Sequence, residues 1–235
     1  KKQRKKSMDD KRKMKELISD ISHQTRTPAA NMKLYLEILK QEDLTQEERT
    51  YYLEKLEMQE EKLEFFMESL VKMSRLESEV LTLHMDDRAV SVTLGKAVAA
   101  IVPKAEKKQI SIYVDCEESI RLYHDAKWTE EAIFNLLDNA VKYTEPKGKI
   151  RISVKEQEIY TKISVRDTGK GIEQSRQAEI FQRFYREPEV YQEEGIGIGL
   201  YLARKIITMQ NGYMEVHSEP GKGSEFQIYL PREEL

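Results

Sequence analysis

The sequence predicts an α+β protein of two domains, in which a long helical hairpin precedes an α/β two-layer sandwich. Before residue 80, apolar residues recur at alternating intervals of four and three, the spacing that keeps side chains on one stripe of a helix. After residue 86, short β-rich runs alternate with helical segments. We therefore divide the chain into a basic linker (1–9), a helical hairpin (10–83) and a sandwich domain (86–235).

The first helix places a histidine outside its apolar stripe. His23 follows Ile21 by two residues, so it points about 200° away from the stripe and faces water or a partner. Thr27 lies one turn further along the same face, and Pro28 predicts a kink beside the histidine. Exposed histidines are usually only solvated, so this position alone does not establish chemistry. The stripe consists of Met14, Ile18, Ile21, Thr25, Pro28, Met32, Tyr35 and Leu39.

A second helix is predicted after a short turn, because Thr45 and Glu48 have the spacing of a capping box. Its stripe consists of Tyr52, Leu56, Gln59, Leu63, Phe66, Leu70, Met73 and Glu77. A lone hairpin leaves a second flank exposed, whereas two hairpins related by a twofold axis form a four-helix bundle. We expect a homodimer through residues 10–80. The alternative is packing of the hairpin on the second domain.

The second domain is predicted from short strands and longer helical segments. Strands are expected at 89–92, 110–114, 120–123, 150–155, 160–167, 213–218 and 225–230, and helices at 94–108, 128–143 and 198–209. The stretch 173–197 lacks periodicity and is rich in charge and glycine, so we expect a lid or loop there.

Composition narrows the class of protein. No run of 18 apolar residues or signal-peptide core occurs, so we expect no membrane-spanning segment, and the lone Cys116 fits a reducing cytoplasm. A net charge of -3 argues against nucleic acid as a partner. The first fifteen residues nevertheless hold nine Lys and Arg against two Asp, as expected on the cytoplasmic side of a membrane helix. We therefore expect a fragment of a larger membrane protein, reaching the membrane only through segments absent from this chain.

A metal and phosphate motif is suggested by NLLDNAVKY (135–143). Asn135 and Asn139 lie one helical turn apart, and Lys142 follows on the same side. Amide oxygens can ligate Mg²⁺ and lysine supplies a point charge for phosphate, so the set suits a metal triphosphate. Two asparagines at this spacing are, taken singly, more often solvent-facing or capping groups.

Three glycine-rich segments follow. In DTGKG (167–171), the glycines allow close approach to a flat ligand, and Asp167 can accept a hydrogen bond from an exocyclic amine. GIGIG (195–199) precedes a helix, whose N-terminus offers an anion site. GKGS (221–224) is equally consistent with a hairpin turn.

Together these four segments resemble, in order and spacing, the ATP-binding domain shared by gyrase, the heat-shock chaperones and sensor histidine kinases. With SHQTRTP (22–28) upstream, residues 10–232 resemble the dimerisation and catalytic core of a bacterial two-component sensor histidine kinase. The resemblance implies ATP and Mg²⁺ as cofactors and the receiver domain of a response regulator as partner. It implies a cytoplasmic domain of a membrane sensor protein.

The resemblance also implies residue roles. His23 would accept the γ-phosphoryl group of ATP, and an aspartate of the regulator would receive it next. Asn139, with Asn135 nearby, would hold Mg²⁺, and Lys142 and Tyr143 would border the nucleotide.

Further roles follow from the glycine-rich segments and the lid. Asp167 would read the adenine amine, in a pocket shaped by Gly169 and Gly171, with Ser224 close to it. FQRFYR (181–186) resembles a lid segment. Phe181 and Phe184 would anchor that lid, Arg183 or Arg186 would touch phosphate, and Gly195, Gly197 and Gly199 would let it close over the triphosphate.

At two positions this chain differs from proteins that it otherwise resembles. Gyrase-type ATPases carry a general-base Glu where this chain has Asn135, so water attack should be slow and a kinase is favoured. Most relatives carry an acid after the phosphoacceptor, where this chain has Gln24, an amide that can accept a hydrogen bond but is a far weaker base. Thr27 occupies the position that helps to dephosphorylate the regulator. The alternative is therefore a nucleotide-binding docking module, or mainly a phosphatase with weak kinase activity.

Overall fold

The computed structural model describes residues 2–77, 82–186 and 197–232, with side chains described from residue 15 onward apart from 16 and 17. The chain divides into two compact units, Lys1–Val71 and Lys72–Leu235. No helix in the described ranges combines the length and apolar character that crossing a bilayer requires.

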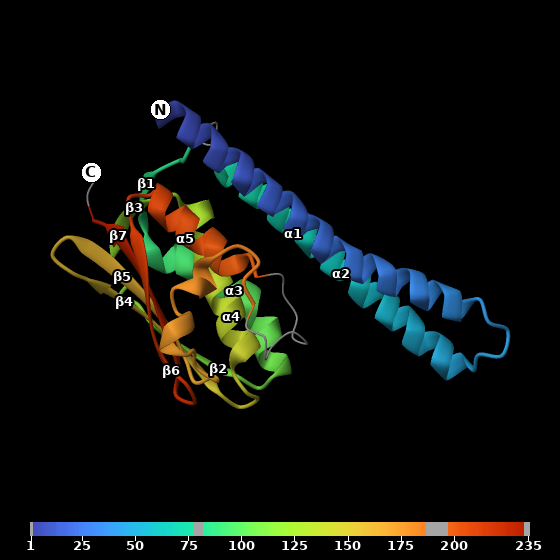
Figure 1. The fold of residues 1–235 in the computed structure, drawn as a ribbon. Coiled ribbons are helices and arrows are strands. Elements are labelled where there is room, and N and C mark those ends of the chain that lie inside the picture. Colours follow the sequence, from blue (N-terminus) through green and yellow to red (C-terminus); the bar gives the residue numbers. More distant parts are fainter. Residues whose placement is uncertain (1, 78–81, 187–196, 233–235) are drawn as a thin grey trace. The chain divides into compact units, whose positions relative to one another are not determined.

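The first unit is a helical hairpin of α1 (Lys2–Leu39) and α2 (Gln46–Glu77), which lie side by side (Figure 1). The end of α2, from Lys72 onward, belongs to the second unit. The predicted capping box is confirmed: the Glu48 amide donates to Thr45 Oγ1 at 3.2 Å, and the Thr45 amide donates to Glu48 Oε2 at 2.9 Å. Residues 1–9, predicted as a linker, belong to α1 from Lys2 onward, because Lys, Arg, Gln and Met favour helix.

The seam between the two helices follows the predicted stripes. Tyr35 and Tyr52 face each other with ring centroids 6.1 Å apart, and Asn31 Nδ2 lies 3.5 Å from Gln59 Oε1. Gln59, the one polar interruption of its stripe before the helix end, is buried and so has a polar partner across the seam. α1 continues through Pro28, and the predicted kink remains a prediction.

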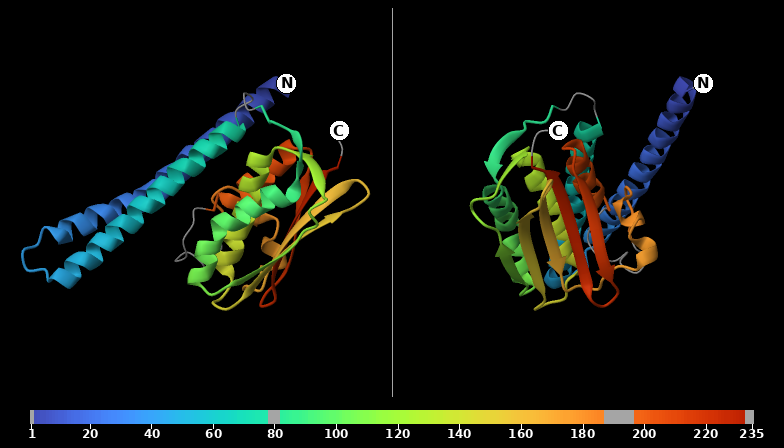
Figure 2. Two further views of the ribbon diagram at one scale, coloured as in Figure 1. Left: turned by 180° about the vertical axis from the view of Figure 1, so that it is seen from behind. Right: turned by 90° about the vertical axis from the view of Figure 1, so that its left-hand side faces the viewer.

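The second unit is a two-layer α/β sandwich. Its elements are β1 (Asp86–Ala89), α3 (Val90–Lys107), β2 (Ser111–Asp115), β3 (Arg121–His124), α4 (Ala126–Tyr143), β4 (Lys149–Glu156), β5 (Tyr160–Asp167), η1 (Gln174–Arg176), η2 (Glu179–Phe181), α5 (Gly199–Met209), β6 (Tyr213–Glu219) and β7 (Gly223–Pro231). Five strands form a sheet in the order β2-β4-β5-β7-β6, antiparallel except for the parallel pair β2–β4. β1 and β3 form a separate antiparallel pair. Helices α3, α4 and α5 cover one face of the sheet, and the other face is open (Figure 2).

The strand predicted at 89–92 is wrong. The strand occupies Asp86–Ala89 instead, and α3 begins at Val90, whose amide donates to the Ile120 carbonyl at 3.1 Å. Val90, Leu94 and Ala97 are fully buried at helical spacing, so helix formation buries more apolar surface than continuation of the strand would.

Helix α4 is the central helix of this layer. One side of it is buried and consists of Thr129, Ala132, Ile133, Leu136, Leu137, Ala140 and Val141. Asn135, Asn139 and Lys142 lie outside this set and are partly exposed. The packing of the core therefore turns the predicted metal and phosphate residues toward solvent.

Candidate functional site

The two ends of α4 are fixed by side chains from distant parts of the unit. At its start, Asp125 Oδ1 accepts from the Trp128 amide at 3.1 Å, and the Asp125 amide donates to Gln210 Oε1 at 2.8 Å. At its end, the Lys108 ammonium donates to the carbonyls of Val141 and Lys142 at 3.0 and 2.7 Å. The ammonium satisfies carbonyls that have no partner within the helix, and its positive charge interacts favourably with the negative C-terminal end of the helix dipole. It fixes the turn that carries Lys142.

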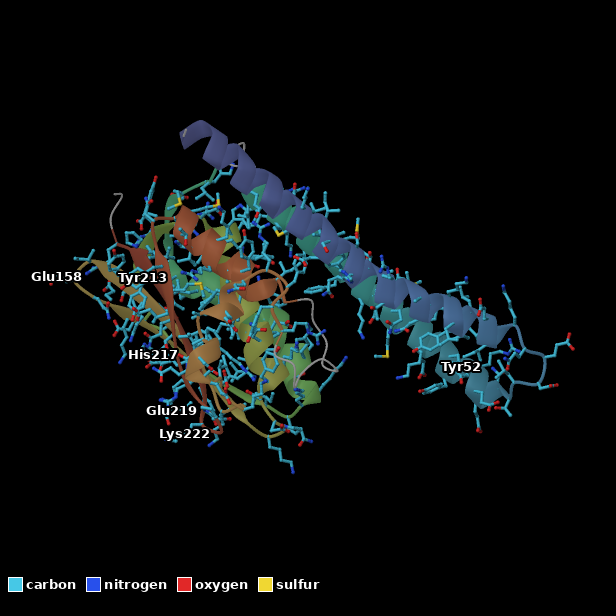
Figure 3. All side chains as sticks on the ribbon, in the orientation of Figure 1. Tyr52, Glu158, Tyr213, His217, Glu219 and Lys222 are labelled. Carbon is cyan, nitrogen blue, oxygen red and sulfur yellow. The ribbon has the colours of Figure 1, made fainter. Side chains whose placement is uncertain are left out.

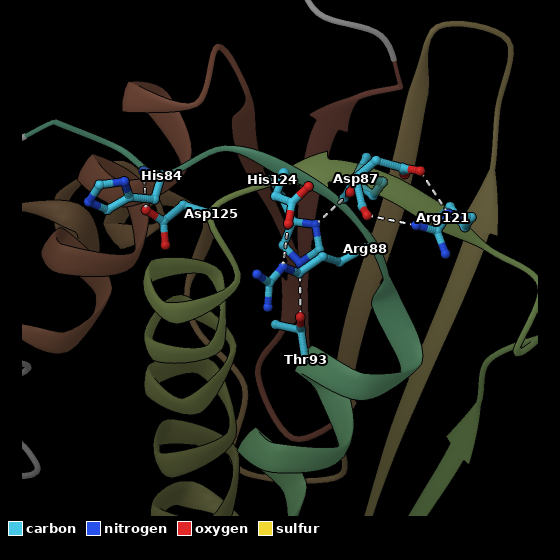
Figure 4. Close-up of polar contacts among 9 residues, drawn as sticks. His84, Asp87, Arg88, Thr93, Arg121, His124 and Asp125 are labelled. Atoms are coloured by element: carbon cyan, nitrogen blue, oxygen red, sulfur yellow. Dashed lines mark hydrogen bonds and ion pairs between the residues drawn. The ribbon is translucent and has the colours of Figure 1, made fainter.

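A buried histidine lies just before α4 (Figure 4). His124 Nε2 is 2.8 Å from Thr93 Oγ1, and its Nδ1 is 2.7 Å from the Leu122 carbonyl oxygen. Burial lowers the pKa of His124, although the Leu122 bond and nearby acids oppose this shift. The adjacent Asp125 also accepts from the His84 amide at 2.8 Å. This polar cluster joins β3, α3 and the start of α4.

Asn135 lies against the start of α5. Its Nδ2 donates to the Glu131 carbonyl at 2.7 Å and lies 3.3 Å from Glu131 Oε1. A Cβ added to Gly199, the first residue of α5, would lie 2.7 Å from Asn135 Oδ1. The side-chain oxygen of Asn135 and the backbone N–H groups of the first turn of α5 therefore lie in one region. An amide oxygen can ligate a metal ion, and the N-terminus of a helix can bind an anion.

Asp167 is a buried acid at the end of β5, with 5% of its surface exposed. Its Oδ1 accepts from the Gly169 amide at 2.8 Å and from the Ser224 amide at 3.2 Å. Burial raises the pKa of Asp167, and these two hydrogen bonds oppose the shift. Because both amides contact the same oxygen, the second carboxylate oxygen can accept from a ligand.

The glycines around Asp167 are required by close backbone contacts. A Cβ on Gly169 would collide with the Tyr143 carbonyl oxygen, and one on Gly223 would collide with the Asp167 carbonyl oxygen. Gly223 also has φ of +89°, which favours glycine. Gly171, with φ of +72°, packs on the backbone of Glu219. The pocket floor is therefore backbone rather than side chain.

Ser224 belongs to a hydroxyl network that the sequence predicted only in part. Its Oγ lies 2.9 Å from Ser218 Oγ, which accepts from the Ile172 amide at 2.8 Å. Ser218 lies on β6, and nothing in the alternating pattern of that strand distinguished it from other residues. This network joins the segment after Gly171 to strands β6 and β7.

Lys142 and Tyr143 lie together at the end of α4, with a second lysine that the sequence analysis had not selected. Lys142 Nζ is 4.7 Å from the centroid of the Tyr143 ring, and Lys170 Nζ is 5.1 Å from it. Lys170 belongs to the DTGKG motif, which was a usable signal. Two ammonium groups thus flank one aromatic ring and suit a polyanionic ligand.

The lid segment is described up to Arg186. Phe181 is buried and its ring lies 6.4 Å from that of Phe226 on β7. The Arg183 guanidinium lies 4.9 Å from the Tyr201 ring centroid and 2.6 Å from Glu77, in the unit that begins at Lys72.

The rest of the lid is partly described. Phe184 has a positive φ of 59°, and its backbone carbon lies 2.8 Å from the Cβ position of Gly197. Arg186 is partly exposed, and Gly195 lies outside the described residues.

The predicted phosphoacceptor lies in the other unit, on α1. His23 and Thr27 are exposed, Gln24 is half-buried and Pro28 is buried, as the stripe predicts. Thr25 donates to the Ile21 carbonyl at 2.8 Å and lies on the buried side. The imidazole is therefore accessible to a reactant.

Family models match both units. Residues 13–79 match the His Kinase A (phospho-acceptor) domain, and residues 124–234 match the histidine kinase-, DNA gyrase B-, and HSP90-like ATPase. The chain belongs to the histidine kinases. Within them, it resembles the sensor kinases, and the two domains follow each other along this chain.

Two curated relatives align along almost the whole chain. Sensor protein DivL of Caulobacter vibrioides is 27% identical over 218 residues, which cover 92% of this chain and 28% of the relative. Sensor protein SrrB of Staphylococcus aureus is 28% identical over 224 residues, which cover 94% of this chain and 38% of the relative. The chain thus spans about a third of the length of these relatives.

Solved structures share the fold. Histidine kinase AdeS of Acinetobacter baumannii superposes with a TM-score of 0.74 at 22% identity, covering 90% of this chain and 98% of that one. Full-length ShkA, solved with AMPPNP, superposes with a TM-score of 0.67 at 25% identity, covering 92% of this chain and 45% of that one. Histidine kinase ThkA, solved with the response regulator protein TrrA, superposes with a TM-score of 0.78 at 19% identity, covering 93% of this chain and 61% of that one.

Proposed function

We propose that this chain transfers the γ-phosphoryl group of Mg-ATP to His23 and then to an aspartate on the receiver domain of a response regulator. The observation that carries the proposal is the buried Asp167, with its glycine-lined floor and the Ser224 amide, in a chain that also exposes His23 on a separate helix. The chain has a domain of the ATPase type, and the similar structure of ShkA was solved with AMPPNP.

The pocket around Asp167 suits adenine. The free carboxylate oxygen can accept from an exocyclic amine, and Gly169 lets a flat ring approach the backbone. Since burial already raises the pKa of Asp167, a hydrogen bond from a ligand stabilises its charged form.

Asn139 and Asn135 are proposed to hold Mg²⁺ through their amide oxygens. Among the described residues, no three His, Cys, Asp or Glu gather into a metal cluster, so the ion would depend on amide oxygens and on the phosphates themselves. The ammonium groups at Tyr143 and the first turn of α5 would offset phosphate charge. Bound Mg²⁺ would neutralise charge that develops on the phosphates. The residues mainly position the reactants.

At His23, an imidazole nitrogen attacks the γ-phosphorus, the bond to the bridging β–γ oxygen breaks, and ADP leaves. Gln24 can accept a hydrogen bond from the other ring nitrogen and fix the tautomer, but it is a poor proton acceptor. With Asn135 in place of a general base for water, ATP is kept for the protein nucleophile.

We propose that two hairpins form a four-helix bundle through residues 10–80. Several large apolar side chains of the hairpin are exposed in the single chain: Ile18, Leu34, Leu36, Tyr51, Leu53, Phe65 and Met67. These lie outside the predicted stripes except for Ile18, and a second hairpin would cover them. The receiver domain would dock on the bundle near His23, where Thr27 can position water for the reverse reaction.

Labelling with γ-³²P-ATP tests the proposal. We expect an acid-labile, alkali-stable label that His23→Ala abolishes and that His217→Ala, at an exposed histidine on β6, preserves. Retained label in His23→Ala would reject the acceptor. The absence of label from the parent chain, with tight ATP binding, would favour the second candidate, a docking module or phosphatase, which rests on Gln24 alone.

A further inference from the structure

The open face of the five-stranded sheet carries a charge arrangement that the nucleotide site does not use. The side chains of this face come from alternate positions of each strand, and the strand register aligns them into rows. The right-hand view of Figure 2 looks onto this face, with the helices behind the sheet.

Two rows place like charges directly opposite each other. Arg151 on β4 pairs in register with Arg166 on β5, and Lys155 pairs with Lys162. The row between them pairs Ser153 with Ser164. We call Arg151, Lys155, Lys162 and Arg166 the cationic strip. Like charges directly opposite in an antiparallel pair are destabilising, so the strip opposes the stability of the sheet.

Nearby acidic groups neutralise the positive charge of the cationic strip only in part. None of its four side chains forms an ion pair or hydrogen bond with the residues that the structure describes. Glu225 is the neighbouring acid on β7, opposite Arg166, but its carboxylate accepts from Ser164 and from Gln227. Burial would raise the pKa of Glu225, but these bonds and the Lys162 and Arg166 charges outweigh it and lower that pKa.

The position of the strip excludes the usual reason for lysine and arginine on a sheet. Charged residues often protect edge strands from pairing with other chains. β4 and β5 are interior strands, since β2 and β6 form the two edges. The strip therefore does not guard an edge.

Acidic and aromatic groups border the strip. Asp115 on β2 lies in the row of Ser153, and Glu215 lies further along the same row on β6. Tyr213 and Tyr229 stack with ring centroids 4.5 Å apart, and Tyr160 contacts Tyr213 edge to face at 5.2 Å. Tyr213, His217 and Glu219 project along β6 (Figure 3). The strip is thus two strands wide, with acids on both sides and a tyrosine cluster at one end.

We propose that the cationic strip is a docking surface for an acidic helix of a partner protein. The two charged rows of the strip are four residues apart along the strands, about 13 Å, which is close to the roughly 11 to 12 Å between positions i and i+7 or i+8 of a helix. An apolar side chain of that helix would lie on the tyrosine cluster. A flat anionic membrane would meet the flanking acids as well, so a narrow acidic element fits better.

The test uses the full 235-residue chain and two labelled helical peptides, one with Glu at i and i+7 and a terminal Phe, the other with Gln in place of Glu. Arg151→Gln with Lys155→Gln is compared with Lys96→Gln with Lys107→Gln, which removes two exposed charges from α3. We expect salt-sensitive binding of the Glu peptide only, weakened roughly tenfold in the strip variant and unchanged in the control.

Thermal unfolding separates docking from a structural role. Because the strip variant relieves repulsion, its Tm should rise by about 2 °C. A fall of several degrees would make the strip structural and overturn the proposal. It would also be overturned by no binding of the Glu peptide, by equal weakening in both variants, or by strip-dependent binding to vesicles of phosphatidylglycerol and phosphatidylcholine instead of the peptide. None of these readouts requires kinase activity.

Discussion

The pocket around Asp167 and the helix face around His23 are built in opposite ways. Asp167 contacts Ser224, 57 positions away, and its floor is formed by backbone from α4, β7 and the glycine segment. The side-chain hydrogen bonds of Ser22 and Thr25, beside His23, stay within the same helix and span three or four positions. A nucleotide pocket therefore depends on the whole sandwich, whereas the acceptor depends on local helix geometry. Changes in the first region should alter nucleotide binding or stability, and changes in the second should alter reactivity alone.

The largest expected effect concerns the pocket. Asp167→Asn removes a charged acceptor for the adenine amine and should weaken ATP binding by about 3 kcal/mol, or roughly a hundredfold. Asn can still accept from the Gly169 and Ser224 amides, and it removes a buried charge whose pKa is raised, so the Tm at neutral pH should not fall. Titration calorimetry measures the affinity.

Asp138→Asn is the matched control. Asp138 lies on α4, and its Oδ1 is 2.6 Å from the ammonium of Lys104 on α3. This variant should leave the ATP affinity unchanged. Equal affinity in Asp167→Asn and the parent chain would show that Asp167 does not contact the nucleotide.

The next effect tests how far the pocket depends on remote residues. Lys108→Met removes an ammonium that donates to carbonyls at the end of α4, and should lower the free energy of unfolding by about 2 kcal/mol. Urea unfolding measures it, with Lys107→Met on the exposed side as control. An unchanged midpoint in Lys108→Met would mean that water replaces these bonds.

On the helix face, Gln24→Glu should act on rate alone. A carboxylate beside His23 can accept the ring proton, so the initial rate of labelling should rise by roughly tenfold, with ATP affinity and Tm unchanged. Gln41→Glu in the hairpin turn supplies the same charge away from His23. A rate that stays at the parent level would indicate that proton acceptance does not limit transfer.

The smallest effect is a pH dependence at His124. Its pKa is lowered by burial, so the unfolded chain binds a proton more readily than the folded one. Stability from this group is complete above about pH 6.5 and is lost as the pH falls toward the lowered pKa. Urea unfolding midpoints measured above and below about pH 6.5 should show this loss of stability, and His124→Gln should make the loss smaller. The same slope in both chains would assign the dependence to other groups.

Much of the fold was predictable where local periodicity carries the information. The capping box of Thr45 and Glu48, the two stripes and the helix that carries Asn135 and Asn139 all follow from spacing within one or two turns. The error at 89–92 arose because Val90 and Val92 fit a strand locally, while burial of α3 favours a helix. Short apolar runs are ambiguous for this reason.

Within the candidate site, the sequence by itself determined the residue types: an acid after a strand, amides one turn apart, glycines before a helix and a histidine outside its stripe. Only the tertiary structure decided that Lys108 would cap α4, that Ser218 would join Ser224, and that like charges would meet on β4 and β5. The reason is physical. Spacing along a helix or strand is set by local backbone geometry, whereas contacts between elements depend on packing and register that no single segment contains.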